Sequence, residues 1–128
     1  IYIAVILRIT VFRSNFSLNS LFQNGNVNLT IFKGYMIFVR SRNWYRFIYL
    51  FVGNIVWFIP FGMYLQYTEK LKNILAVTLC GMLFSLCIET LQFVFGTGVT
   101  ELDDLILNTF GAFIGAVSVK LFQKFRNR

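Results

Sequence analysis

The sequence has no histidine and only two cysteines among its 128 residues. Without histidine, the chain lacks the side chain that most often serves proteins as a general base or a metal ligand. Cys80 and Cys87 are seven residues, or two turns, apart in one predicted helix, which indicates neither a disulfide nor a pair of metal ligands. We therefore expect no metal and no cofactor, and the sequence identifies no catalytic residue.

Charged residues are also scarce. They make up 13% of the chain, against about 25% in an average soluble domain, while hydrophobic residues make up 57%. A single domain of this length cannot bury so much apolar surface, because the buried fraction grows only slowly with chain length. The sequence therefore predicts an integral membrane protein whose main partner is the lipid bilayer.

Acidic residues are the rarer charged type, with five against 12 Lys and Arg, so the net charge is +7. A basic chain can indicate binding to nucleic acid. Here, however, the basic residues flank apolar segments, as Lys and Arg do at the ends of membrane helices. No basic helix and no interleaving of basic and aromatic residues outside these segments supports binding to nucleic acid, so we expect no such partner.

Three apolar segments are long enough to cross a bilayer, which takes about 20 residues. They cover residues 47–67, 73–95 and 102–122. The first contains the only proline, Pro60, which removes a backbone donor and should bend or break the helix near Val56–Pro60. We predict an all-α, polytopic membrane helix bundle with three full transmembrane helices and an incomplete N-terminal one.

The incomplete helix is the apolar segment at residues 1–13, which is too short to span and lacks the features of a signal peptide. Residues 14–46 are predicted to be a polar and basic loop, rich in asparagine at first, with a short re-entrant or interfacial piece at 31–39. An aromatic and basic group typical of the headgroup region follows: Arg40, Arg42, Trp44, Tyr45 and Arg46. We expect residues 1–128 to form one membrane domain.

The distribution of basic residues predicts the orientation. Six Lys and Arg lie in the turn at 68–72 and at the C-terminal end, and the turn at 96–101 has none. Since basic residues favour the cytoplasmic side, we predict a cytoplasmic C-terminus and an outside position for residues 96–104. The segment before residue 47 would then also lie outside, although it carries several basic residues, so the rule is only weakly obeyed.

The last two apolar segments each carry their few polar and small residues at steps of three and four, which is the period of one helix face. These residues are Thr78, Gly81, Ser85, Glu89 and Gln92 on the first segment, and Asp104, Asn108, Gly111, Gly115 and Ser118 on the second. A carboxylate such as Glu89 is costly in lipid unless it faces protein or water, and it is therefore a functional-site hypothesis.

An antiparallel hairpin around Gly98 would bring these two faces together. At equal depth, the small residues should pair as Gly81 with Gly115 and Ser85 with Gly111, since Gly-x-x-x-Gly permits close approach of two helices. The polar residues should pair as Glu89 with Asn108 and Gln92 with Asp104. We expect all of these side chains to face away from lipid.

The polar cluster near the outer end would consist of Asn54, Glu89, Gln92, Asp104 and Asn108. One interpretation is a hydrogen-bond network that only holds the helices together. Another is an outward-open pocket for a polar or lipid-linked ligand. A third is acid–base catalysis by Glu89 and Asp104, which is less favoured because no histidine, nucleophilic cysteine or metal-ligand set accompanies them.

At these same residues the chain resembles the VanZ-like family of bacterial membrane proteins, over roughly residues 47–120. The resemblance rests on GNIVWFIPFG at 53–62, on Glu89-x-x-Gln92, and on Asp103-Asp104-x-x-x-Asn108-x-x-Gly111-x-x-x-Gly115. The polar positions of the family fall on Asn54, Pro60, Glu89, Gln92, Asp104 and Asn108. Many members carry an arginine before the acidic pair, which is absent from FVFGTGVTELDD here. If that arginine binds an anionic lipid or glycan group, this chain either lacks the contact or supplies it from Arg42 or Arg46.

The resemblance implies a multi-pass protein of the bacterial cytoplasmic membrane. The family is associated with low-level resistance to the glycopeptide antibiotic teicoplanin, so the implied role is an altered response of the cell envelope to glycopeptides. The implied partner of the polar cluster is a lipid-linked cell-wall precursor or the glycopeptide itself. The alternatives are a membrane-embedded enzyme acting on a lipid-linked substrate and a structural subunit of a membrane complex.

Overall fold

The computed structural model describes residues 1–12, 16–22, 25–68 and 73–126. Within these residues it contains five α-helices, one short 3-10 helix and two three-residue strands. In chain order the elements are α1 (Tyr2–Thr10), η1 (Leu18–Ser20), β1 (Asn26–Asn28), α2 (Lys33–Arg40), α3 (Trp44–Tyr67), α4 (Ile74–Phe95), β2 (Val99–Glu101) and α5 (Leu102–Arg126). The predicted all-α class is confirmed, with one small pair of strands as the exception.

Helices α3, α4 and α5 are each long and apolar enough to cross a membrane, which confirms the three predicted spans. Helix α3 begins at Trp44 rather than at residue 47, because the Asn43 side chain caps it by accepting a hydrogen bond from the Arg46 N–H at 3.2 Å. Helix α4 ends at Phe95 and is capped by Gly96, whose φ of 59° lies in the left-handed region that glycine adopts without strain.

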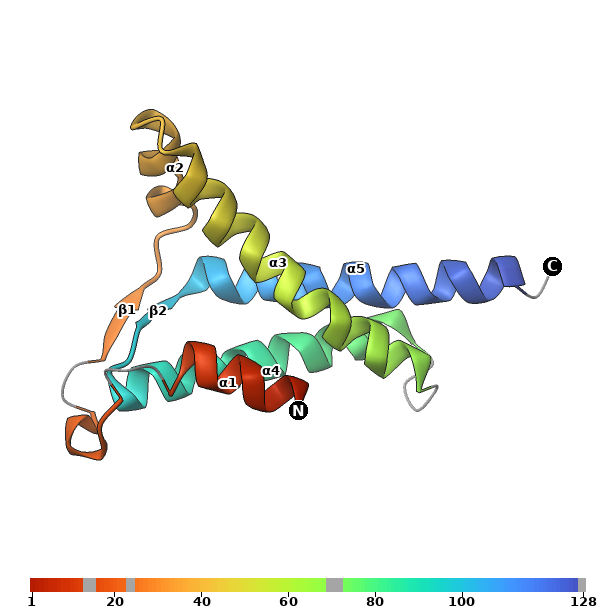
Figure 1. The fold of residues 1–128 in the computed structure, drawn as a ribbon, viewed down its shortest axis with the longest axis horizontal. Coiled ribbons are helices and arrows are strands. Elements are labelled where there is room, and N and C mark those ends of the chain that lie inside the picture. Colours follow the sequence, from red (N-terminus) through yellow and green to blue (C-terminus); the bar gives the residue numbers. More distant parts are fainter. Residues whose placement is uncertain (13–15, 23–24, 69–72, 127–128) are drawn as a thin grey trace.

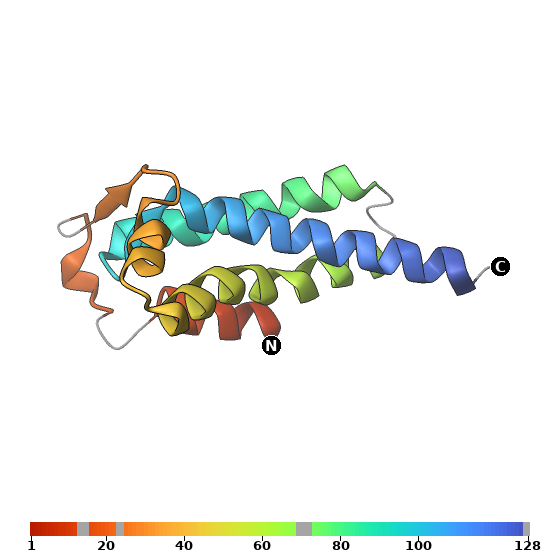
Figure 2. The ribbon, with the colours of Figure 1, turned by 90° about the horizontal axis from the view of Figure 1, so that it is seen from above.

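Helix α5 is the centre of the bundle (Figure 1). It makes its largest contact with α3 and its next largest with α4. Figure 2 shows α4 and α5 side by side along one side of the molecule, with α3 and α1 along the other. Helix α3 crosses α5 obliquely. The end of α3 that lies near α2 therefore diverges from α4, and α1 lies at the same end of the bundle.

Small residues allow the close contact between α5 and α3. A Cβ atom added at Gly111 or Gly115 would lie 2.2 Å from the carbonyl oxygen of Ile55 or 2.1 Å from that of Ile59, respectively. From the other side, a Cβ at Gly62 would lie 2.0 Å from the carbonyl oxygen of Ala112. The Gly-x-x-x-Gly pair therefore packs on α3, and the predicted pairing of these glycines with α4 is wrong.

The register of α4 on α5 also differs from the predicted one by about one turn. Gly81 faces Ala112 instead of Gly115. A Cβ atom added at Gly81 would lie 2.4 Å from the Cβ atom of Ala112. Ser85 accepts a hydrogen bond from Asn108 at 2.9 Å instead of lying beside Gly111. Most of the polar face is nevertheless buried on both helices, as predicted, and Glu89 is only 3% exposed, whereas Ser118 near the C-terminal end of α5 is exposed.

The extended strand β2 explains the shift in register. The predicted pairing of residues at equal depth assumes a compact turn between α4 and α5. Val99–Glu101 is instead extended and runs back along the end of α4. A strand rises about 3.3 Å per residue and a helix about 1.5 Å. The chain therefore reaches the depth of Glu89 already at Glu101, where a hydrogen bond joins the two residues, before α5 begins.

Helix α3 continues through Pro60, which is exposed on its surface. The helix break that the sequence predicts near Val56–Pro60 is therefore absent. Pro60 lies on the exposed side of α3, away from the side that packs on α5, so the backbone donor that it lacks does not disturb that contact. The alternative, a bend without a break, stays a prediction.

The region predicted as a polar loop, 14–46, contains η1 and β1 besides α2. Strand β1 pairs in parallel with β2, with Asn26 opposite Val99 and Asn28 opposite Glu101. Ahead of it, α1 inserts Ile6, 3% exposed, into the core formed by Phe58, Ile88 and Ala112. Whether α1 belongs to a longer membrane helix stays a prediction.

Candidate functional site

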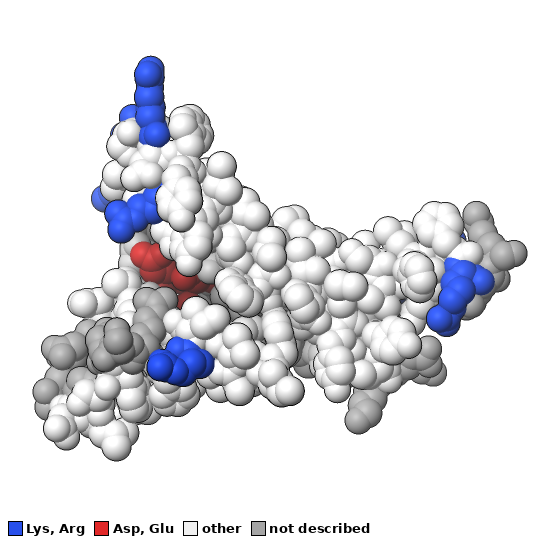
Figure 3. All heavy atoms as spheres, viewed as in Figure 1, with Lys and Arg blue, Asp and Glu red and all other residues white. Residues whose placement is uncertain are grey.

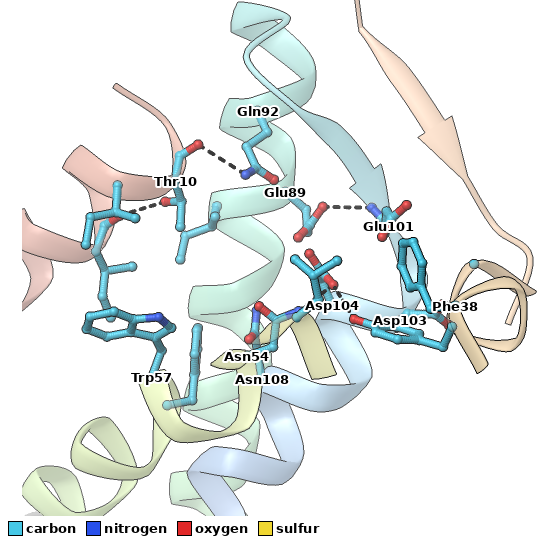
Figure 4. A pocket seen from close by; sticks show the side chains of 17 residues that line it. Thr10, Phe38, Asn54, Trp57, Glu89, Gln92, Glu101, Asp103, Asp104 and Asn108 are labelled. Atoms are coloured by element: carbon cyan, nitrogen blue, oxygen red, sulfur yellow. Dashed lines mark hydrogen bonds between the residues drawn. The ribbon is translucent and has the colours of Figure 1, made fainter. Parts of the chain in front are cut away.

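A cavity of about 230 Å³ lies at the end of the bundle where α1, α2, α3, α4, α5 and β2 meet (Figure 4). It is lined by apolar and aromatic side chains and by a group of polar ones. All five residues of the predicted polar cluster are among them: Asn54, Glu89, Gln92, Asp104 and Asn108. The structure thus brings together side chains from three predicted membrane helices.

Asp104 lies in the first turn of α5, where a carboxylate interacts favourably with the helix dipole. Its Oδ1 atom accepts a hydrogen bond from Asn54 Nδ2 at 2.5 Å and a longer one from the Tyr35 hydroxyl at 3.5 Å. The partners come from α3 and α2, so this carboxylate joins three helices around the cavity.

Glu89 is held by the strand that follows its own helix. Its Oε2 atom accepts a hydrogen bond from the Glu101 N–H at 3.0 Å, and its backbone carbonyl accepts one from the Thr100 hydroxyl at 2.9 Å. Figure 4 shows the Glu89 and Asp104 side chains pointing toward one another across the cavity. The two carboxylates therefore face the same enclosed space.

Asp103 fixes α2 to the start of α5. Its side chain is 2% exposed, and Oδ1 accepts a hydrogen bond from the Phe32 N–H at 2.8 Å. Phe32 precedes α2 and has a φ of 53°, an unusual conformation for a large side chain. The bond to Asp103 stabilises that conformation and places Tyr35, one turn later, over the cavity.

Only one end of the Gln92 side-chain amide forms a hydrogen bond with the residues that the structure describes. Its Nε2 atom donates to the carbonyl oxygen of Thr10 at 3.2 Å, which ties α4 to the end of α1. Its Oε1 atom is buried and accepts no hydrogen bond from the residues that the structure describes. The side chain is 6% exposed and lines the cavity, so the unsatisfied acceptor belongs to a residue of the cavity wall.

The electrostatic character of the cavity is acidic. Glu89, Glu101, Asp103 and Asp104 line it, and of the described residues no Lys or Arg does. Figure 3 shows acidic atoms at the bottom of a hollow, with basic side chains over α1 and over the end that carries α2. Burial, and then the nearby Asp104 carboxylate, raise the pKa of Tyr35, so its hydroxyl remains a donor at neutral pH.

Metal binding finds no support here. Among the described residues, no group of three or more His, Cys, Asp or Glu side chains has an arrangement that could hold a metal ion. Both cysteines are free thiols, and neither lines the cavity. What the site offers is a set of hydrogen-bond acceptors next to aromatic side chains.

Sequence reasoning missed Thr10, Tyr35 and Glu101, which come from segments predicted to be a helix remnant, a loop and a turn. Of these three, only Glu101 had a signal in the sequence, because it lies beside the acidic pair Asp103 and Asp104. The two arginines considered as substitutes for the missing family arginine do not line the cavity. Arg46 instead lies over the ring of Phe38, 5.8 Å from its centre.

Comparison with known proteins identifies the family of the chain. No solved structure matches the chain significantly. Over 130 aligned residues, the chain is 28% identical to the Protein VanZ of Enterococcus faecium, and the alignment covers all of this chain and 74% of that protein. The model of the VanZ/LLP1 family matches residues 1–123. Because that match covers nearly the whole sequence, the chain belongs to the VanZ/LLP1 family.

Proposed function

We propose that this chain is a protein of the bacterial cytoplasmic membrane that alters the response of the cell to teicoplanin-type glycopeptides. Its binding site is the acidic cavity, which opens to the outer leaflet, where lipid-linked precursors of the cell wall are exposed. The observation that carries the proposal is that Asn54, Glu89, Gln92, Asp104 and Asn108, spread over three helices, line one cavity.

Two features favour a binding site over a purely structural network. Gln92, which lines the cavity, has an Oε1 atom without a partner among the described residues, and a donor on a ligand would satisfy it. The cavity volume of about 230 Å³ also leaves room for several non-hydrogen atoms, since a single water needs only about 15 Å³. The arrangement therefore supports an external ligand.

The orientation is part of the proposal. Residues 96–104 lie at the same end of the bundle as the cavity, and the C-terminus of α5 lies at the opposite end (Figure 1). With the basic C-terminal end in the cytoplasm, the cavity faces the outside of the cell. The predicted cytoplasmic turn at 69–72 lies outside the described residues.

Measured susceptibility to teicoplanin tests the proposal. A susceptible bacterial host that expresses the chain should need more teicoplanin for growth inhibition than the same host without it. Asp104→Asn should reduce the difference, because it removes a charge from the cavity. Gln66→Leu, at a buried position outside the cavity, should keep it. Unchanged susceptibility with well-expressed wild-type chain would refute the proposed role.

The enzyme alternative is distinguished by Glu89→Gln. The amide keeps the size of the side chain and its acceptor for the Glu101 N–H, but it cannot act as a base. A binding site should retain part of the effect on susceptibility. Complete loss, with normal amounts of protein in the membrane, would favour catalysis instead.

A further inference from the structure

Among the described residues, the charged side chains that line the cavity are all acidic. Each of its four carboxylates accepts hydrogen bonds through one oxygen only: Glu89 Oε2, Glu101 Oε1, Asp103 Oδ1 and Asp104 Oδ1. Among the described residues, no cation forms an ion pair with them inside the cavity. Buried carboxylates without a positive partner carry a large desolvation cost. A ligand that brings a positive charge would reduce that cost.

The neutral side chain of Gln92 also favours a ligand that donates hydrogen bonds. Gln92 is 94% buried, its Oε1 atom has no partner in the described part of the chain, and its side chain points into the cavity in Figure 4. This acceptor is independent of the acidic residues and, like them, requires a donor. Glu89 Oε1, Asp104 Oδ2 and Gln92 Oε1 give three acceptors without described partners, and a primary ammonium has three N–H donors.

Aromatic side chains complete the lining. Tyr35, Phe38, Trp57 and Phe58 come from α2 and α3. Aromatic faces attract cations through their quadrupole and repel anions. A phosphate group would meet carboxylates and aromatic rings here, with no Lys or Arg from the described residues to neutralise it.

We infer that the cavity binds the primary ammonium group of a ligand through Glu89, Gln92 and Asp104, and that it does not bind phosphate. The volume of about 230 Å³ is below the usual 300–1,000 Å³ of pockets for drug-sized ligands. Only the amino-bearing head of a larger molecule therefore enters. This inference rests on the proposed function, whose ligand class it names.

Tryptophan fluorescence tests the inference directly. The chain has two tryptophans, and only Trp57 lines the cavity. In the full chain with Trp44→Phe, purified in phosphatidylcholine nanodiscs, ethylammonium chloride should change Trp57 emission in a saturable way. Ethanol, inorganic phosphate and sodium chloride at equal ionic strength should not. Saturable binding of phosphate, or an equal response to ethanol, would overturn the inference.

A matched pair of glutamines supplies the control. Gln66 and Gln92 are both buried, and Oε1 of each lacks a hydrogen bond within the described residues, but only Gln92 lines the cavity. Gln92→Leu should weaken ethylammonium binding at least tenfold, and Gln66→Leu should leave it unchanged. Asp104→Asn should weaken it further. Equal affinity in Gln92→Leu and the parent, both folded by circular dichroism, would contradict the inference.

The ammonium could belong to a lipid headgroup or to a molecule outside the bilayer, and the nanodisc composition separates these sources. If phosphatidylethanolamine competes with ethylammonium, the amine is that of a lipid head; if it does not, the amine belongs to a non-lipid ligand. Both results support an ammonium site. The proposed function fails separately, when ethylammonium binds but the chain leaves teicoplanin susceptibility unchanged.

Discussion

At the scale of residues, the polar side chains inside the bundle divide into those that hold helices together and those that remain available. Asn108 and Ser85 belong to the first kind, because their side chains bond directly between α5 and α4 at 2.9 Å and both are buried. Gln92 belongs to the second kind, since one end is bound to α1 and the other is unpartnered in the described residues. In the proposed function, this division separates residues that hold the helices together from residues that contact the ligand.

The Asn108–Ser85 bond should have a measurable coupling energy. In a double-mutant cycle with Asn108→Ala and Ser85→Ala, we expect about 0.6 kcal/mol of coupling in the free energy of unfolding, the average for such bonds between membrane helices. Denaturation of the detergent-solubilised chain provides the measurement. Thr90, exposed on α4 and bonded to its own helix, should show no coupling with Asn108. Equal coupling in both cycles would contradict the assignment.

At the scale of elements, the contact between α3 and α5 depends on glycine more than on side-chain interlocking. Gly62, Gly111 and Gly115 each place another helix's carbonyl group where a Cβ atom would be. The stretch from Gly111 to Gly115 is the packing signature seen in the sequence, but α3 provides the partner. Close approach of these two helices then positions Asn54 against Asp104.

Gly62→Ala should therefore destabilise the fold far more than Gly53→Ala on the same helix. The added Cβ would lie 2.0 Å from the Ala112 carbonyl oxygen in the first case and would meet nothing within 4 Å in the second. Overpacking of this kind costs about 1–3 kcal/mol. Thermal unfolding in detergent should show a clearly lower midpoint for Gly62→Ala only. Similar midpoints for the two variants would show that α3 and α5 do not pack this closely.

At the scale of the whole molecule, the cavity and the basic C-terminal end lie at opposite ends of the bundle. This polarity makes the orientation testable with single cysteines in a chain that lacks Cys80 and Cys87. A cysteine at Gly98 should react with a membrane-impermeant reagent on intact cells, and one at Lys124 should react only after permeabilisation. The reverse pattern would place the cavity on the cytoplasmic side and would contradict a site for cell-wall precursors.

The sequence by itself determined the class of protein and the faces that are buried. Long apolar segments with few charges can only be membrane helices, and polar residues at helical spacing within them must turn away from lipid. This is why Asn54, Glu89, Gln92, Asp104 and Asn108 were recognised as one cluster without coordinates. Their common cavity follows from the same cost of exposing polar groups to hydrocarbon.

Only the tertiary structure decided which helix each face meets and what else reaches the site. The register of α4 on α5 depends on the extended backbone of Val99–Glu101, whose pairing with Asn26–Asn28 joins segments more than 70 residues apart. Gly111 and Gly115 could pack on either neighbouring helix, since small residues permit close approach of two helices without selecting a partner. Thr10 and Tyr35 enter the cavity from short helices with no polar periodicity. Local pattern determines burial, whereas register and partners depend on how the whole chain packs.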